Sequence, residues 1–272
     1  MRHQKKRWLA ALLTLCMLLS ILPSISLAFG KSEETWSGNR TNQTIDGGTH
    51  TITLSNLTID SPRLGKSAID ITGNADVTFI LEGNNTLSGR PNHPAIWVQS
   101  GSSVTFEGTG TLNTSAGGTT PGFGAAGIGG GYGADSDFGD ITINGGTIIA
   151  RGSGGGAGIG GGYEVGSGTV TGNITINGGY VTAIGGSSGS TGGAGIGSGE
   201  NANYGGTVTI NGGVVYAEGG ADSTSIGSGN RAIGTSDNGT FTTGTDGNAV
   251  IVAPDGIGDP SGFADWDGIY QL

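Results

Sequence analysis

One phrase, Ala-Gly-Ile-Gly-Gly-Gly, constrains the fold of this chain more than any other feature. It occurs at residues 126–131 and 157–162, returns with one serine at residues 194–199, and returns again, shortened, at residues 225–229. Two earlier copies carry fewer glycines but keep the isoleucine. The isoleucines of all six copies are Ile69, Ile96, Ile128, Ile159, Ile196 and Ile226. A recurrence about every 30 residues is typical of solenoids, in which each repeat is one structural unit.

Short segments of alternating apolar and polar residues follow each phrase. Residues 141–144, 174–177 and 208–211 share the pattern Ile/Val-Thr-Ile-Asn. In each of these repeats a Gly-Gly pair follows, and then another alternating segment, at residues 147–150, 180–183 and 214–217. Period-two alternation predicts strands, and no segment has helical periodicity. A single unit cannot bury its apolar face, whereas units stacked about 4.8 Å apart bury isoleucine on isoleucine.

The sequence therefore predicts an all-β, right-handed parallel β-helix of six to seven coils over residues 50–253. An antiparallel sandwich is the rival fold, but it does not explain why corresponding strands share a sequence. The chain has 60 glycines, and we expect them at the turns between strands, where glycine takes a positive φ without a Cβ penalty. Asn144, Asn177 and Asn211 precede Gly-Gly pairs, so we expect them to be left-handed residues that bond their stacked neighbours. Ligand contact is their alternative role.

The two ends of the chain depart from the repeat. Residues 1–28 combine a basic start, an apolar run and a final Ser-Leu-Ala, which is typical of a cleaved secretory signal peptide. A retained membrane anchor is the alternative. Residues 29–49 and 254–272 are expected to cap the two ends of the solenoid, and the second segment has a linker as its alternative. The one cysteine, Cys16, lies in the leader, so disulfides and thiol chemistry are excluded from the secreted chain.

The charge of the secreted chain limits its partners. The leader holds four of the 11 Lys and Arg residues, which leaves 7 against 21 Asp and Glu, a formal charge of −14. Such a chain repels phosphates, so nucleic acid and anionic membranes are not expected partners. The expected location is extracellular or at the cell surface.

Candidate binding residues lie in the long loops that follow the glycine phrase. Stacked insertions line one side of a solenoid, which is often its binding side. These loops carry three aromatic residues, Tyr132, Tyr163 and Tyr204, which either contact a carbohydrate or cover the turn beneath them. Asp135, Asp137 and Asp140 are spaced so that their oxygens could converge on Ca²⁺. A solvated acidic loop is the alternative for these three.

Trp97 is a further candidate on a strand. Its neighbours Ile96 and Val98 share the inward parity, so Trp97 and, one coil earlier, Asp70 should point outward. An exposed indole would suit stacking on a sugar ring. Packing under the loop at residues 90–93 is the alternative.

Catalysis finds little support in the sequence. The secreted chain has two histidines, His50 and His93, and two lysines, Lys31 and Lys66, and none shares a coil position with a carboxylate cluster. A polysaccharide hydrolase would use a carboxylate pair with one raised pKa, for which Asp135 and Asp137 are weak candidates. The chain is therefore not expected to be an enzyme.

The segment Ser67-Ala68-Ile69-Asp70-Ile71, with the glycine phrase and the Ile-Thr-Ile-Asn-Gly-Gly strands, resembles the glycine-rich repeats of secreted Gram-positive surface proteins. Residues 50–253 also resemble, more loosely, a bacterial β-helix family that binds polygalacturonate and cellulose and contains calcium. The resemblance implies a non-catalytic polysaccharide-binding module, and no binding residue is transferred by it. A structural or adhesive spacer, a pectin-degrading enzyme and an ice-binding threonine face are the alternatives.

Overall fold

The structure is a computed structural model that describes residues 32–60, 65–118, 123–165, 168–230, 238–244, 248–258 and 269–271. The chain divides into two compact units, Met1–Ser32 and Glu33–Leu272. The predicted signal peptide lies outside the described residues, so the account below concerns the second unit. No described helix is long and apolar enough to cross a membrane.

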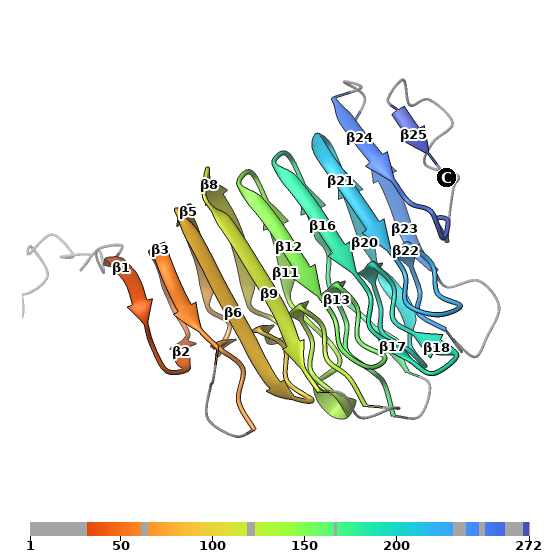
Figure 1. Cartoon of the computed structure of the whole chain (residues 1–272), viewed down its shortest axis with the longest axis horizontal. Helices are drawn as coiled ribbons and strands as arrows, with labels where there is room; N and C mark the ends of the chain where they lie inside the picture. Colours follow the sequence, from red (N-terminus) through yellow and green to blue (C-terminus); the bar gives the residue numbers. More distant parts are fainter. Residues whose placement is uncertain are drawn as a thin grey trace, which may run out of the picture. The chain divides into compact units, whose positions relative to one another are not determined.

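The described residues of the second unit form parallel strands that stack in the order of the repeats (Figure 1). Each repeat contributes one strand to a 7-stranded sheet and further strands to a curled 16-stranded sheet. The 7-stranded sheet holds the isoleucine of each phrase. Its strands are β2 (Gln43–Asp46), β4 (Ile69–Thr72), β7 (Ile96–Val98), β10 (Ile128–Gly129), β13 (Ile159–Gly160), β19 (Ile196–Gly197) and β22 (Ile226–Gly227).

The 16-stranded sheet has two arms that meet in one long strand, β3 (Thr49–Ile59), on which both β5 and β6 pair. The first arm holds β5 (Asp76–Glu82), β8 (Ser103–Gly108), β11 (Asp140–Ile143), β14 (Thr169–Val170), β15 (Ile174–Ile176), β20 (Asn203–Ile210) and β23 (Asn238–Thr243). The second arm holds β6 (Asn84–Pro91), β9 (Thr111–Gly117), β12 (Thr147–Arg151), β16 (Tyr180–Ile184), β21 (Gly213–Glu218), β24 (Ala249–Val252) and β25 (Ile269–Gln271).

Four further elements complete the described fold. Strand β1 (Ser32–Asn39) pairs with β3, and β17 (Ser187–Ser188) forms a short antiparallel pair with β18 (Thr191–Gly192). A 3₁₀ turn, η1 (Gly133–Asp135), lies in the loop after β10. Trp36 on β1 is buried against Phe79 at a ring distance of 6.3 Å, and Phe79 packs on Phe106 at 5.9 Å.

The register of the strands confirms the register predicted from the isoleucines. Ile128 pairs with Ile96 on one side and Ile159 on the other, and the series continues through Ile196 to Ile226. All of these side chains are at most 1% exposed. The pairing between repeats is parallel, which contradicts the antiparallel sandwich and is consistent with a parallel β-solenoid.

In the four later repeats, the glycine after the isoleucine makes the corner. Gly129, Gly160, Gly197 and Gly227 have φ values of 131°, 131°, 135° and 131°. A Cβ at Gly129 would lie 2.0 Å from the carbonyl oxygen of Gly160, and one at Gly160 would lie 1.9 Å from that of Gly197. Glycine is therefore required at this position for two reasons: its backbone conformation and the close approach of the next coil.

The asparagine prediction is confirmed for its hydrogen bonds and wrong for its backbone. Asn177 Nδ2 donates to Asn144 Oδ1 and Asn211 Nδ2 donates to Asn177 Oδ1, each at 2.8 Å, so the three side chains form a ladder. None of the three has a positive φ. The second glycine of each Asn-Gly-Gly turn takes that conformation instead, as at Gly179 with φ 87°, because glycine adopts it at lower cost than asparagine.

Candidate functional site

The long loops after β10, β13 and β19 lie beside one another and form what we call the loop side. Backbone hydrogen bonds join them from coil to coil: Gly133 N donates to Tyr163 O at 2.8 Å, and Glu164 N donates to Glu200 O at 3.0 Å. Glycines at the corners bring the loops close enough for these bonds. Side chains on these loops are therefore held on a backbone that is fixed at every coil.

Three aromatic rings form a run that starts at Phe123, just before β10, and continues onto the loop side at Tyr132 and Tyr163. Tyr132 and Tyr163 stack with 5.5 Å between ring centroids and 18° between ring planes, and Phe123 contacts Tyr132 at 5.0 Å. Both tyrosines are half-buried, and Phe123 is 39% exposed. Asn201 Nδ2 donates to the Tyr163 hydroxyl at 2.9 Å. The structure thus brings together two predicted tyrosines and adds Phe123, which sequence reasoning did not select.

Tyr204 does not belong to the loop side, and its prediction as a surface residue is wrong. The side chain is 1% exposed and stacks on Phe138 at 6.4 Å. Its hydroxyl donates to Gly172 O at 2.9 Å, and burial raises the pKa of this phenol far above its ordinary value. Tyr204 shares the inward parity of Val208 and Ile210 on β20, and this alternation is the signal that would have placed it in the core.

Two of the three aspartates of the predicted calcium site accept hydrogen bonds from different backbone groups. Asp137 accepts a hydrogen bond from Thr171 N at 2.7 Å, and Asp140 accepts one from Asn173 N at 3.0 Å. Asp135 is exposed in η1. Among the residues that the structure describes, no three His, Cys, Asp or Glu side chains form a group that could hold a metal ion. The prediction that these three aspartates bind calcium therefore gains no support from their placement.

Trp97 has the outward parity that the sequence predicted, but its ring is half-buried. It lies between Asp70 and Gly129 in the register of the 7-stranded sheet, and its indole N–H is buried without a hydrogen-bond partner. A freely exposed indole face is therefore not present. The packed alternative agrees better with the structure.

Asp70, beside Trp97, is a buried carboxyl group. It is 3% exposed, and its Oδ2 lies 3.8 Å from Nζ of Lys66. Burial raises the pKa of Asp70, and the charges of Lys66 and His93 oppose this rise. Burial lowers the pKa of His93, against the attraction of Asp70 and Asp135. Sequence parity placed Asp70 outward but gave no sign that it would be covered.

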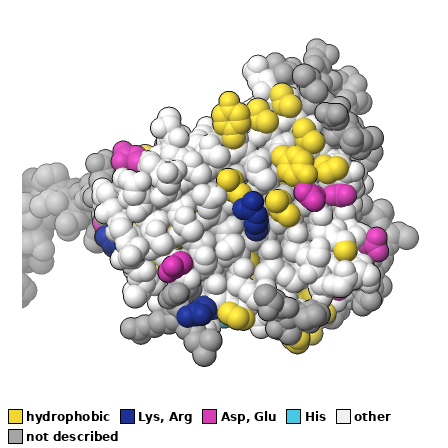
Figure 2. Space-filling view, viewed as in Figure 1, with side chains coloured by type: hydrophobic (Ala, Val, Ile, Leu, Met, Phe, Trp, Pro, Cys, Tyr) yellow, Lys and Arg dark blue, Asp and Glu magenta, His cyan; other side chains and the backbone are white. Residues whose placement is uncertain are grey.

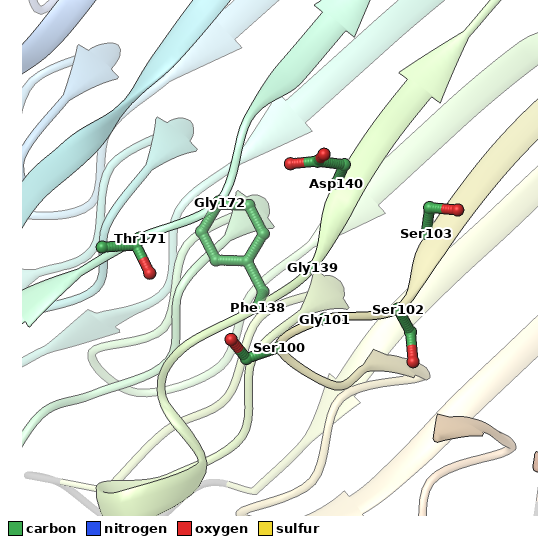
Figure 3. Close-up of a pocket in the computed structure, with 9 residues that line it drawn as sticks. All are labelled: Ser100, Gly101, Ser102, Ser103, Phe138, Gly139, Asp140, Thr171 and Gly172. Atoms are coloured by element: carbon green, nitrogen blue, oxygen red, sulfur yellow. The ribbon is translucent and has the colours of Figure 1, made fainter. Parts of the chain in front are cut away.

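One open cavity of about 240 Å³ lies where the loop side meets the 16-stranded sheet (Figure 3). Ser100, Ser103, Asp140 and Thr171 lie around the Phe138 ring in this view. The ring is buried, and Asp140 is already bound by Asn173, so the cavity offers mainly hydroxyl and backbone groups. Its volume is below the roughly 300 Å³ at which typical ligand pockets begin.

A second surface that sequence reasoning missed lies on the outer face of the second arm. Tyr180 on β16 is 64% exposed and Val214, its partner on β21, is 40% exposed. Figure 2 shows hydrophobic side chains gathered over this part of the sheet, with basic and acidic groups next to them. The outward parity applied to Trp97 would have identified it, because Val181 and Ala183 face the core.

Comparison with known proteins does not assign the chain to a family. No family model matches it, and neither a curated protein nor a solved structure matches it.

Proposed function

We propose that the protein is a secreted, non-catalytic carbohydrate-binding β-solenoid whose loop side holds the glycan. The observation that carries this proposal is the run of Phe123, Tyr132 and Tyr163 across neighbouring coils. Aromatic rings offer apolar area to the C–H groups of a sugar at low conformational cost, because they have few rotatable bonds. A rigid backbone below them reduces the ordering cost of binding.

Polar groups for sugar hydroxyls flank the run. Asp135 is exposed, and Glu164 and Asn201 are half-buried beside the tyrosines. Glu164 also hydrogen-bonds Ser136, and Asn201 bonds Tyr163, so both side chains are already oriented. Polar groups that are positioned before binding lose less entropy when a ligand arrives, and they give orientation specificity.

The proposal includes a right-handed parallel β-helix of six to seven coils. In-register parallel pairing of six successive repeats supports the coil count. Right-handed crossover is the general rule where parallel strands of one sheet are connected. On this rule we propose that the coils are right-handed.

The charge of the chain favours a neutral glycan. A formal charge of −14 for the secreted chain repels polygalacturonate unless cations bridge the two, and the three candidate aspartates do not converge. We therefore expect uncharged plant or cell-wall polysaccharides to bind better than anionic ones.

The test is retention of the purified protein on insoluble neutral polysaccharides and on polygalacturonate, each with and without a chelator. We expect retention on a neutral glycan, and about tenfold weaker binding by Tyr163→Ala, which corresponds to about 1.4 kcal/mol. Tyr180→Ala, which removes an exposed tyrosine from another face, is the matched control and should bind normally.

Three results would contradict the proposal. No retention on any glycan would favour the structural or adhesive spacer. If Tyr180→Ala lost binding and Tyr163→Ala did not, the glycan would bind the outer face of the second arm and not the loop side. Release of reducing or unsaturated ends from the polysaccharide would show catalysis.

A further inference from the structure

The outer face of the second arm changes character along the solenoid. On β6 and β9 the outward side chains are polar. From β12 onward most are apolar or aromatic, and we name the outward residues of β12, β16 and β21 the Tyr180 face. Its members are Thr147, Ile149 and Arg151 on β12, Tyr180, Thr182 and Ile184 on β16, and Val214, Tyr216 and Glu218 on β21.

Exposed apolar groups of this kind indicate a partner. Soluble monomers rarely expose contiguous apolar patches of more than a few hundred Å². Here an exposed Tyr180 and Val214 adjoin half-buried Ile149, Ile184 and Tyr216 on three paired strands of one sheet. Figure 2 shows the main concentration of hydrophobic side chains in that view over the same part of the sheet.

The charges of the Tyr180 face are arranged around its central strand. Arg151 and Glu218 both pair with Ile184, one coil to each side of it. Arg151 is exposed and, among the described residues, has no ion-pair partner. Glu218 accepts a hydrogen bond from the Tyr216 hydroxyl at 2.8 Å through Oε2. The face thus has a positive group one coil before its centre and a negative group one coil after it.

We propose that the Tyr180 face binds a second copy of this chain in a two-fold symmetric, face-to-face dimer. A two-fold axis that runs along β16 between the two faces reverses the solenoid direction of the second copy. It places β12 opposite β21 of the second copy and β16 opposite β16. Arg151 then faces Glu218 of the second copy, twice, and Ile149 faces Tyr216. Such a patch is complementary to itself, as an isologous interface requires.

The size of the face sets the strength of the dimer. Strands β9, β12, β16, β21 and β24 lie symmetrically about β16 in the sheet order. Five strands of about five residues cover about 24 by 16 Å, or about 400 Å² per copy. A standard interface buries about 800 Å² per partner. The dimer is therefore weak and reversible, and it forms as the protein concentration rises.

The test is sedimentation velocity of the purified protein over a concentration series, with charge reversal at both positions. We expect a reversible dimer that Arg151→Glu and Glu218→Arg each weaken at least tenfold. The double variant Arg151→Glu/Glu218→Arg restores the pairing and should return to within about threefold of the original. Tyr180→Ala should also weaken the dimer, and Tyr132→Ala on the loop side should not.

Each alternative outcome is decisive when circular dichroism shows that the variants are folded. A protein that stays monomeric at every concentration overturns the proposal. A double variant that dimerises no more tightly than either single variant also overturns it, because residues 151 and 218 of the two copies would then not face each other. A dimer weakened by Tyr132→Ala but not by Tyr180→Ala would place the contact on the loop side. Dimer formation is measured without glycan, so its result is independent of carbohydrate binding.

Discussion

Substitution of Gly160 by alanine tests the physical basis of the corner. Gly160 has a φ of 131°, and an added Cβ would lie 1.9 Å from the carbonyl oxygen of Gly197 on the next coil. That oxygen accepts a hydrogen bond from Gly161 N at 2.8 Å. The neighbouring coil must therefore move by about 1 Å, which disturbs both packing and this bond.

The loss of folding stability in Gly160→Ala is the sum of three contributions. Holding alanine at this φ costs about 1–3 kcal/mol, overpacking costs about 1–3 kcal/mol, and the weakened hydrogen bond costs about 1 kcal/mol. We expect Gly160→Ala to lower the free energy of unfolding by about 4 kcal/mol. This is a large part of the 5–15 kcal/mol that typical domains possess.

Two other glycines with positive φ separate the cost of the backbone conformation from the cost of the clash with the next coil. Gly227 has the same φ of 131°, but its added Cβ would meet only the Thr224 hydroxyl at 3.1 Å and Gly258 Cα at 3.4 Å. Gly189 has a φ of 67° and nothing within 4 Å. We expect costs of about 2 kcal/mol for Gly227→Ala and about 1 kcal/mol for Gly189→Ala. Urea unfolding of the three variants gives the order. Equal costs for Gly160→Ala and Gly227→Ala would refute the role of the stacked carbonyl.

Three further substitutions test the ladder, the buried carboxyl and the core tyrosine by thermal and urea unfolding. Asn177→Ala removes two exposed side-chain hydrogen bonds and should cost about 1 kcal/mol, whereas Thr175→Ala next to it should cost less. Tyr204→Phe leaves Gly172 O without its donor and should cost about 1–2 kcal/mol. Burial raises the pKa of Asp70, so the folded state binds the proton more tightly than the unfolded state and stability falls as pH rises through this range. Asp70→Asn should therefore stabilise the protein at pH 7, by about 1.4 kcal/mol for each unit of pKa difference. The gain should vanish near pH 3, where Asp70 is protonated in both states, and a gain that persists there would contradict the explanation.

The repeat made the strand register predictable from sequence. The coils stack in one direction, so aligning Ile128 with Ile159 predicts which strands pair, although the offset changes from 31 residues there to 33 between Ile141 and Ile174. The same reasoning correctly predicted that Asn177 would bond its stacked neighbours. It failed on the asparagine backbone, because the sequence does not show which of three successive residues completes the turn.

The predictions for individual loop residues were less successful for a physical reason. Tyr163 and Tyr204 both follow a glycine phrase, yet one lies on the loop side and the other in the core. The difference arises because the partner of Tyr204 in the preceding coil is Val170 on β14, not Tyr163, and both Val170 and Tyr204 face the core. Loop length varies between repeats, and the stacking direction does not determine where a strand of the next coil begins.

The stacked strands also show which surface features the fold itself explains. At the corners of the four later coils an added Cβ would clash or meet a strained backbone, and the side chains inside the coils are mostly apolar. At the outward positions of the strands, the fold requires neither glycine nor an apolar side chain. Asn113 on β9 and Ile149 on β12, for example, are direct partners in the same sheet. A polar side chain therefore satisfies the fold at this position as well as an apolar one. Stacking cannot account for an exposed Tyr180, and a partner that covers the ring can.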